Sequence, residues 1–86
     1  MPAKLTTPTV HLNGTGRQNL IDQYADAYQA LNDALQVLAL SHPNARDYYV
    51  QGPDAFPRAA DEHDDRMQRF TTVRDELLAL YNAVAG

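Results

Sequence analysis

Residues 21–38 read IDQYADAYQALNDALQVL, and their apolar side chains recur with helical spacing. The apolar positions, separated by three or four residues, are Ile21, Tyr24, Tyr28, Leu31, Leu35 and Leu38. This alternation is typical of an amphipathic helix with a coiled-coil seam. A second row, seven residues apart, consists of Leu20, Ala27 and Ala34 and widens the apolar stripe. The pattern predicts a helix over about residues 16–41 with more apolar surface than one partner helix would cover.

Local signals predict where this helix begins and ends. Thr15 followed three residues later by Gln18 matches a capping box, in which each side chain bonds the backbone amide of the other residue. Pro43 disfavours helical geometry at the residue before it, so the helix should end near Leu40 or Ser41.

A second amphipathic pattern fills the C-terminal part of the chain and predicts a helix over about residues 54–85. Asp54 is a suitable N-cap, and Pro57 is tolerated within the first turn. Its apolar seam consists of Phe56, Ala60, His63, Met67, Phe70, Val73, Leu77, Leu80 or Tyr81, and Val84.

These elements predict an all-α protein, an antiparallel two-helix hairpin that forms a single domain over residues 10–86. Residues 1–9 are expected to be a flexible tail, and residues 10–14 an extended arm that packs Val10 and Leu12 on a helix. Each helix carries a stripe wider than one seam. Either a second copy covers the surplus, in a homo-oligomeric helical bundle, or the arm covers it within one protomer.

Composition limits the possible partners. The chain has 86 residues, no cysteine and a net charge of −4, which argues against binding to duplex nucleic acid or an anionic membrane. No apolar run approaches the roughly 20 residues that span a bilayer, and the N-terminus lacks a signal-peptide core. We therefore expect a cytoplasmic protein, and a small core that oligomerisation would supplement.

The connection over about residues 42–53 is long for a helical hairpin and rich in recognition residues. It contains Arg46, Asp47, Tyr48, Tyr49 and Gln51. Aromatic faces stack on planar groups, arginine pairs with phosphate or carboxylate, and Asp and Gln read polar edges. The alternative is that the tyrosines close the open end of the hairpin while Arg46 and Asp47 form a surface pair.

A second candidate site precedes the first helix and contains His11, Asn13, Thr15 and Arg17. Its two glycines and the helix N-terminus would suit an anion, although the alternative is a capped helix start. In a hairpin this segment lies at the opposite end from the 46–52 loop, so one site could combine them only between antiparallel protomers.

A third candidate pair is His63 and Arg66, one helical turn apart, which could line a pocket below the tyrosines. The alternatives are a core histidine and a ladder of exposed helix pairs formed by Asp54, Arg58, Glu62 and Arg66. No metal-binding spacing is present, so neither metal nor cofactor is expected. Catalysis has little support, because Ser41 and His42 are merely sequence neighbours.

The motifs HLNGT at 11–15, PNARDYYVQG at 43–52 and Glu62-His63 with Arg66 resemble a family of small uncharacterised phage and prophage proteins. That resemblance implies a phage context and assigns no catalytic residue. Size and expected layout are also similar to phage counter-defence sponge proteins, which sequester immune-signalling nucleotides.

Two functions follow as hypotheses. The chain would be a non-enzymatic protein that sequesters a nucleotide-derived signalling molecule in the cytoplasm of an infected bacterium. Alternatively, it would be an adaptor or inhibitor that docks on a host or virion protein through the 46–52 loop.

Overall fold

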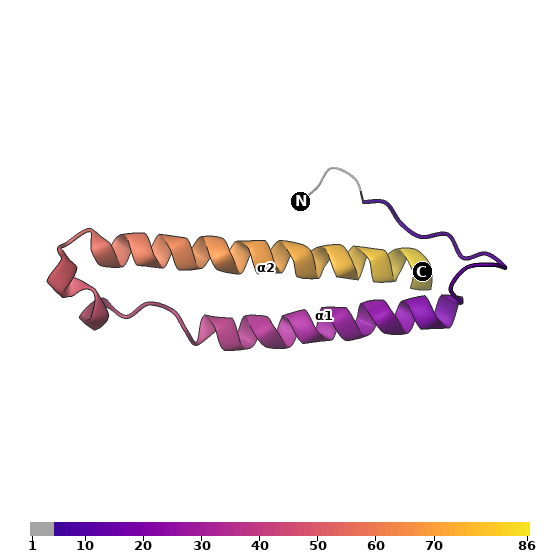
Figure 1. Cartoon of the computed structure of the whole chain (residues 1–86), viewed down its shortest axis with the longest axis horizontal. Helices are drawn as coiled ribbons and strands as arrows, with labels where there is room; N and C mark the ends of the chain where they lie inside the picture. Colours follow the sequence, from indigo (N-terminus) through magenta and orange to yellow (C-terminus); the bar gives the residue numbers. More distant parts are fainter. Residues whose placement is uncertain (1–4) are drawn as a thin grey trace.

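The computed structural model describes residues 5–86 as two long α-helices joined by a structured loop (Figure 1). Helix α1 spans Arg17–Ala39 and helix α2 spans Ala55–Ala85. Two single-turn 3₁₀-helices, η1 over Ala45–Asp47 and η2 over Tyr49–Gln51, lie between them. Residues 5–86 contain no β-strand, so the predicted all-α class is confirmed. Residues 1–4 of the expected flexible tail lie outside the described part of the chain.

The two helices run side by side in opposite directions (Figure 1). Three contacts mark this order along the hairpin. Arg17 bonds Val84 at one end, Asn32 bonds Arg74 near the middle, and His42 packs on His63 towards the loop. Each step forward along α1 is a step backward along α2, which is the antiparallel arrangement of a helical hairpin.

The predicted capping box at the start of α1 is wrong. The helix begins at Arg17, and Gly16 occupies the N-cap without a side-chain bond. Gln18 donates forward instead, from Nε2 to Asp22 Oδ1 at 2.8 Å. With Gly16 as the cap, Gln18 is one position too early to reach back to the cap amide, and the side chain one turn ahead is its natural partner.

The other helix boundaries fall within two residues of the predicted ones. Helix α1 ends at Ala39, and its last turn tightens as the amides of Leu40 and Ser41 bond the carbonyls of Val37 and Leu38. Asp54 is the N-cap residue of α2, as predicted, but its side chain makes no capping bond. Its carbonyl accepts from the amide of Arg58 at 3.2 Å.

The core of the hairpin is thin. Among the described residues the buried apolar side chains are Leu35, Ala55 and Val84, and the one buried polar residue is His63. The remaining predicted seam residues of α1, among them Ile21, Tyr24 and Leu31, are only half-buried. A helix facing one partner can bury only one side, so the wide apolar stripe stays partly in solvent.

The N-terminal arm does not provide the expected cover. Residues 5–11 have no regular secondary structure, and the chain runs beyond the end of the helix pair before it enters α1 (Figure 1). Leu12 is 98% exposed and Val10 is 45% exposed, so the prediction that Leu12 packs on a helix is wrong for this protomer. Neither helix of the described chain combines the length and the hydropathy that crossing a bilayer requires.

Leu35 offers a direct test of the thin core. Replacing Leu35, 7% exposed, with Ala should lower the free energy of unfolding by about 2–3 kcal/mol because it leaves a cavity between the helices. The control is Val37→Ala, two residues away and 68% exposed, which should change stability by less than about 0.5 kcal/mol. Urea unfolding followed by circular dichroism measures both, and equal effects would contradict this packing.

Gly52 turns the loop into α2 with backbone angles that other residues rarely adopt. Its φ of 111° and ψ of 170° lie in a region open almost only to glycine. Gly52→Ala should therefore cost about 1–3 kcal/mol through backbone strain. Gly16→Ala is the matched control, since Gly16 has a φ of −61° and open space around a Cβ, and thermal unfolding should show it near wild type.

Candidate functional site

The loop between the helices is an ordered structure held by its own backbone. Asn44 caps η1, accepting from the amide of Arg46 at 3.2 Å through Oδ1. The amides of Asp47 and Tyr48 bond carbonyls in the first turn, and those of Gln51 and Gly52 do the same in the second. Two consecutive hydrogen-bonded turns therefore position the recognition residues.

The two tyrosines have different environments. Tyr48, at the junction of η1 and η2, is half-buried, whereas Tyr49 is 73% exposed. Arg46, Asp47 and Gln51 are exposed as well. One tyrosine of the loop is thus partly covered, and the other stands in solvent with an arginine three residues before it.

Val50 extends the exposed apolar surface beside Tyr49. It is 77% exposed, so two adjacent large side chains stand in water at the tip of the hairpin. Exposed apolar side chains at a loop tip are available for contact with a partner, which is why Val50 is considered together with Tyr49.

The segment before α1 is folded into a turn. The amide of Gly14 donates to the carbonyl of His11 at 3.1 Å, and the His11 ring lies against Gly14, with Nε2 2.7 Å from where a Cβ would stand. Asn13 and Thr15 are exposed. This turn lies at the opposite end of the hairpin from the loop that joins α1 to α2, as the predicted topology requires (Figure 1).

Arg17, a predicted ligand residue, joins the two helix ends. Its Nε donates to the carbonyl of Val84 at 3.0 Å, and its Nη2 donates to that of Ala85 at 2.8 Å. The last carbonyls of a helix have no partner within it and carry partial negative charge, so a guanidinium is favourable there. A role for Arg17 in ligand binding stays a prediction, and it has to accommodate these two bonds.

His63 and Arg66 do not share a pocket. His63 is 2% exposed, and its ring packs edge-on against His42, with ring centroids 5.2 Å apart. The two histidines line a cavity of about 290 Å³, whose other lining residues are Ala39, Asp64, Met67, Gln68 and Thr71. Neither loop tyrosine lines this cavity, so His63 does not form a floor beneath them.

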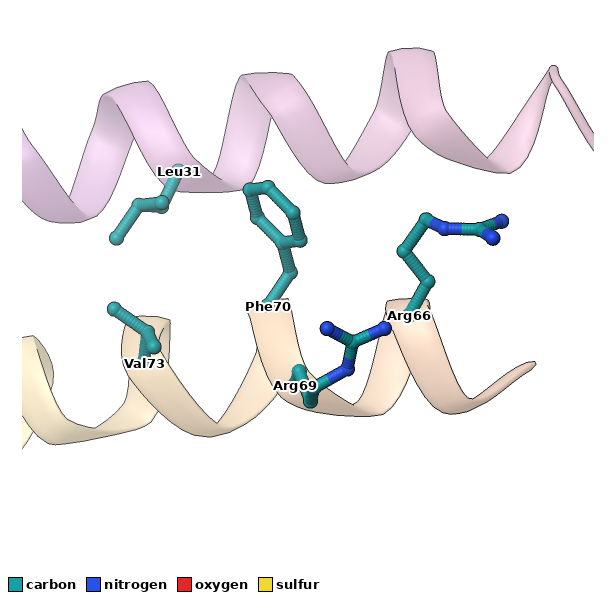
Figure 2. A pocket seen from close by; sticks show the side chains of 5 residues that line it. All are labelled: Leu31, Arg66, Arg69, Phe70 and Val73. Carbon is teal, nitrogen blue, oxygen red and sulfur yellow. The ribbon is translucent and has the colours of Figure 1, made fainter. Parts of the chain in front are cut away.

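Arg66 lies on the other side of the helix seam, at an apolar cavity of about 170 Å³ (Figure 2). Leu31 and Phe70 point into the space between the helices there, Val73 lies one turn along α2, and Arg69 flanks them (Figure 2). The predicted ladder of exposed pairs is replaced by Arg69 with Asp65 at 3.0 Å and Arg74 with Asp75 at 3.2 Å, the ion pairs found within residues 5–86.

Sequence reasoning missed two residues that tie the helices together. Arg74 donates to Asn32 Oδ1 at 3.2 Å, and its guanidinium carbon lies 5.9 Å from the centre of the Tyr28 ring. The second residue is His42, which the sequence places in the loop beside Ser41 and which packs on His63. Aligning the two apolar seams antiparallel would place Arg74 opposite Asn32 and His42 opposite His63, but the sequence around Arg74 and His42 has no pattern that indicates these contacts.

Within residues 5–86 no group of three or more metal-ligating side chains converges. The Ser41 hydroxyl donates to the carbonyl of Leu38 at 2.7 Å, and His42 Nδ1 lies 2.9 Å from the carbonyl of Pro43. The hydroxyl and the imidazole are thus committed to backbone partners, not to each other.

Comparison of the chain with family models, with curated proteins and with solved structures gave no match. The resemblance to small phage proteins therefore stays a hypothesis drawn from the motifs of the sequence.

Removing the Arg17 guanidinium should loosen the end of the hairpin. Arg17→Gln loses the two bonds to α2 carbonyls and should lower the free energy of unfolding by about 1 kcal/mol. Amide hydrogen exchange should rise mainly in the last turn of α2. Arg58→Gln, an exposed arginine at the other end, is the control and should leave both measurements unchanged. Protection of α2 unaffected by Arg17→Gln would contradict this role.

Proposed function

We propose that this protein binds, without turning over, an anionic ligand that carries a planar aromatic group, and that the 46–51 loop is the principal contact. A nucleotide-derived signalling molecule of host immunity is the ligand class that best fits, and sequestration in the cytoplasm of an infected bacterium is the resulting function. The phage context comes from the motif resemblance alone.

The exposure of Tyr49 beside Arg46 carries this proposal. The Tyr49 ring is 73% exposed, so it contributes little buried area to the fold, and its backbone lies within a hydrogen-bonded turn. A base stacked on an aromatic ring is worth about 1–3 kcal/mol, and arginine supplies a forked donor for phosphate. Asp47 and Gln51, both exposed, provide polar groups for the edge of a base.

Binding without turnover is supported by how the nucleophile and base candidates are used. Ser41 bonds a backbone carbonyl and His42 packs on the buried His63 ring. A hydrolase needs a nucleophile within hydrogen-bond reach of a base, and these two residues do not form such a pair.

A second function, docking on a host or virion protein, is favoured by Val50. A valine that is 77% exposed has no role in holding a nucleotide, but beside Tyr49 it would form the centre of a protein interface. Tyrosine and arginine are the residue types enriched among interface hot spots.

Titration separates the two functions. A panel of cyclic dinucleotides and ADP-ribose derivatives is titrated calorimetrically into wild-type protein and into Tyr49→Ala, Arg46→Gln and Val50→Ala. For a nucleotide ligand, the first two variants should bind about tenfold or more weakly, since each loses a stacking or charge-assisted contact. Val50→Ala should bind as wild type, and the recovered nucleotide should be chemically unchanged.

A protein that binds no nucleotide but loses a protein partner in the loop variants would be an adaptor. No calorimetric heat and no thermal shift with any member at millimolar concentration would overturn nucleotide binding, because a ligand of the folded state must raise apparent stability. In that case Val50→Ala and Tyr49→Ala should together abolish recovery of a protein partner, while Arg58→Gln, an exposed arginine outside the loop, should retain it.

A further inference from the structure

One side of the hairpin carries an apolar face that the protomer leaves partly open. We define it by Leu31, Phe70 and Val73, which line the cavity of about 170 Å³, and call it the Phe70 face (Figure 2). Phe70 is 38% exposed and Val73 is 46% exposed. Both belong to the central part of α2, where a coiled-coil seam should be best covered.

The second apolar row of α1 continues this face outward. At 100° per residue, Leu20, Ala27 and Ala34 lie within about 60° of Leu31, turned away from the buried Leu35. Ala34 is exposed, and the other two are half-buried. Small side chains in such a row allow another helix to approach closely.

The protomer exposes more surface than a compact chain of its mass. Its accessible area is 6229 Å², against about 5,100 Å² expected for a compact monomer of 9.6 kDa. Its radius of gyration is 18.2 Å, against about 12 Å expected for its length. Residues 5–16 account for part of the excess. The excess of about 1,100 Å² is comparable with the roughly 800 Å² that each partner buries in a standard interface.

The arrangement of charges favours a second copy of the chain as the partner on this face and an antiparallel orientation for that copy. Arg69 and Glu76 are two helical turns apart on the same side of α2, with Val73 between them. A two-fold axis through Val73, perpendicular to the helices, sets Arg69 of each copy opposite Glu76 of the other. An axis along the hairpin would instead set Arg66 and Arg69 against their own copies, which is repulsive.

We infer that a second copy of this chain packs antiparallel on the Phe70 face, with the two-fold axis near Val73, to form a four-helix bundle. Leu31, Phe70 and Val73 of both copies then share one core, and the row of Leu20, Ala27 and Ala34 lies along its edge. The arrangement is isologous, since each copy presents the same surface to the other.

This register brings the two candidate segments together. Helix α2 extends about 27 Å from Val73 towards the loop and about 18 Å towards its C-terminus, by helix rise. The loop of one copy therefore extends past the α2 end of the other by about 9 Å and lies over the segment that leads into α1. Insofar as the proposed ligand binding holds, His11, Asn13 and Thr15 of one copy would face Tyr49 of the other.

Single cysteines test the face, because the chain has none of its own. Val73→Cys, at the axis, should oxidise to a disulfide-linked dimer, and wild-type protein should have twice the 9.6 kDa mass by light scattering. Leu78→Cys, 37% exposed and about 140° round the helix, is the matched control and should not link. A monomeric mass, or linking equal at both positions, would overturn the inference.

Charge exchange tests the direction. Arg69→Glu and Glu76→Arg should each weaken dimerisation about tenfold or more, because each sets like charges against each other twice. The double variant should recover the wild-type dimer in the antiparallel register and not in a parallel one. The exposed Asp65–Arg69 pair contributes little, so the helices themselves should stay folded by circular dichroism.

These measurements contain no ligand, so they separate the two proposals. If the protein is a dimer but binds none of the nucleotides, the Phe70 face is the dimer interface and the proposed function is overturned. A monomer that still binds a nucleotide overturns the dimer alone.

Discussion

A helix packed against a single partner can bury only one of its sides. This limit on apolar burial determines the shape and the stability of the whole hairpin. The hairpin buries Leu35 within its seam and Val84 near the end of α2, but leaves Phe70 and Val73 partly in water. Burial of apolar area is the main favourable term in folding. A chain of this length that forms only two helices buries little apolar area, so its stability is low. The elongated shape, the open apolar face and the expected association all follow.

Polar contacts across the seam supplement the few buried apolar side chains. Arg17 bonds the C-terminal carbonyls of α2, and Arg74 bonds Asn32 on the facing helix. The Arg74 bond is partly buried, which makes it more effective than an exposed pair. In the loop, likewise, backbone hydrogen bonds within η1 and η2 stabilise the chain in place of side-chain packing. The backbone of the tip is therefore ordered by hydrogen bonds although its side chains Tyr49 and Val50 are exposed.

The ordered backbone of the loop connects the fold to the proposed function. A loop whose backbone is already hydrogen-bonded loses less backbone entropy on binding than an irregular loop does. Yet one protomer offers no enclosing wall, and small-molecule sites are concave. The antiparallel dimer would supply that wall from the segment before α1. Dimerisation would thus cover the apolar Phe70 face and would also add a second wall to the polar site at the loop.

The sequence by itself determined the all-α class and the positions of both helices to within two residues. Periodicity and proline placement are local properties, so a sequence pattern indicates them directly. Only the tertiary structure decided that Tyr48 is half-buried while Tyr49 is exposed, that His63 contacts His42, and that Arg17 caps a helix 67 residues away. Those outcomes depend on which side chains the antiparallel register brings together, and no local spacing encodes that register.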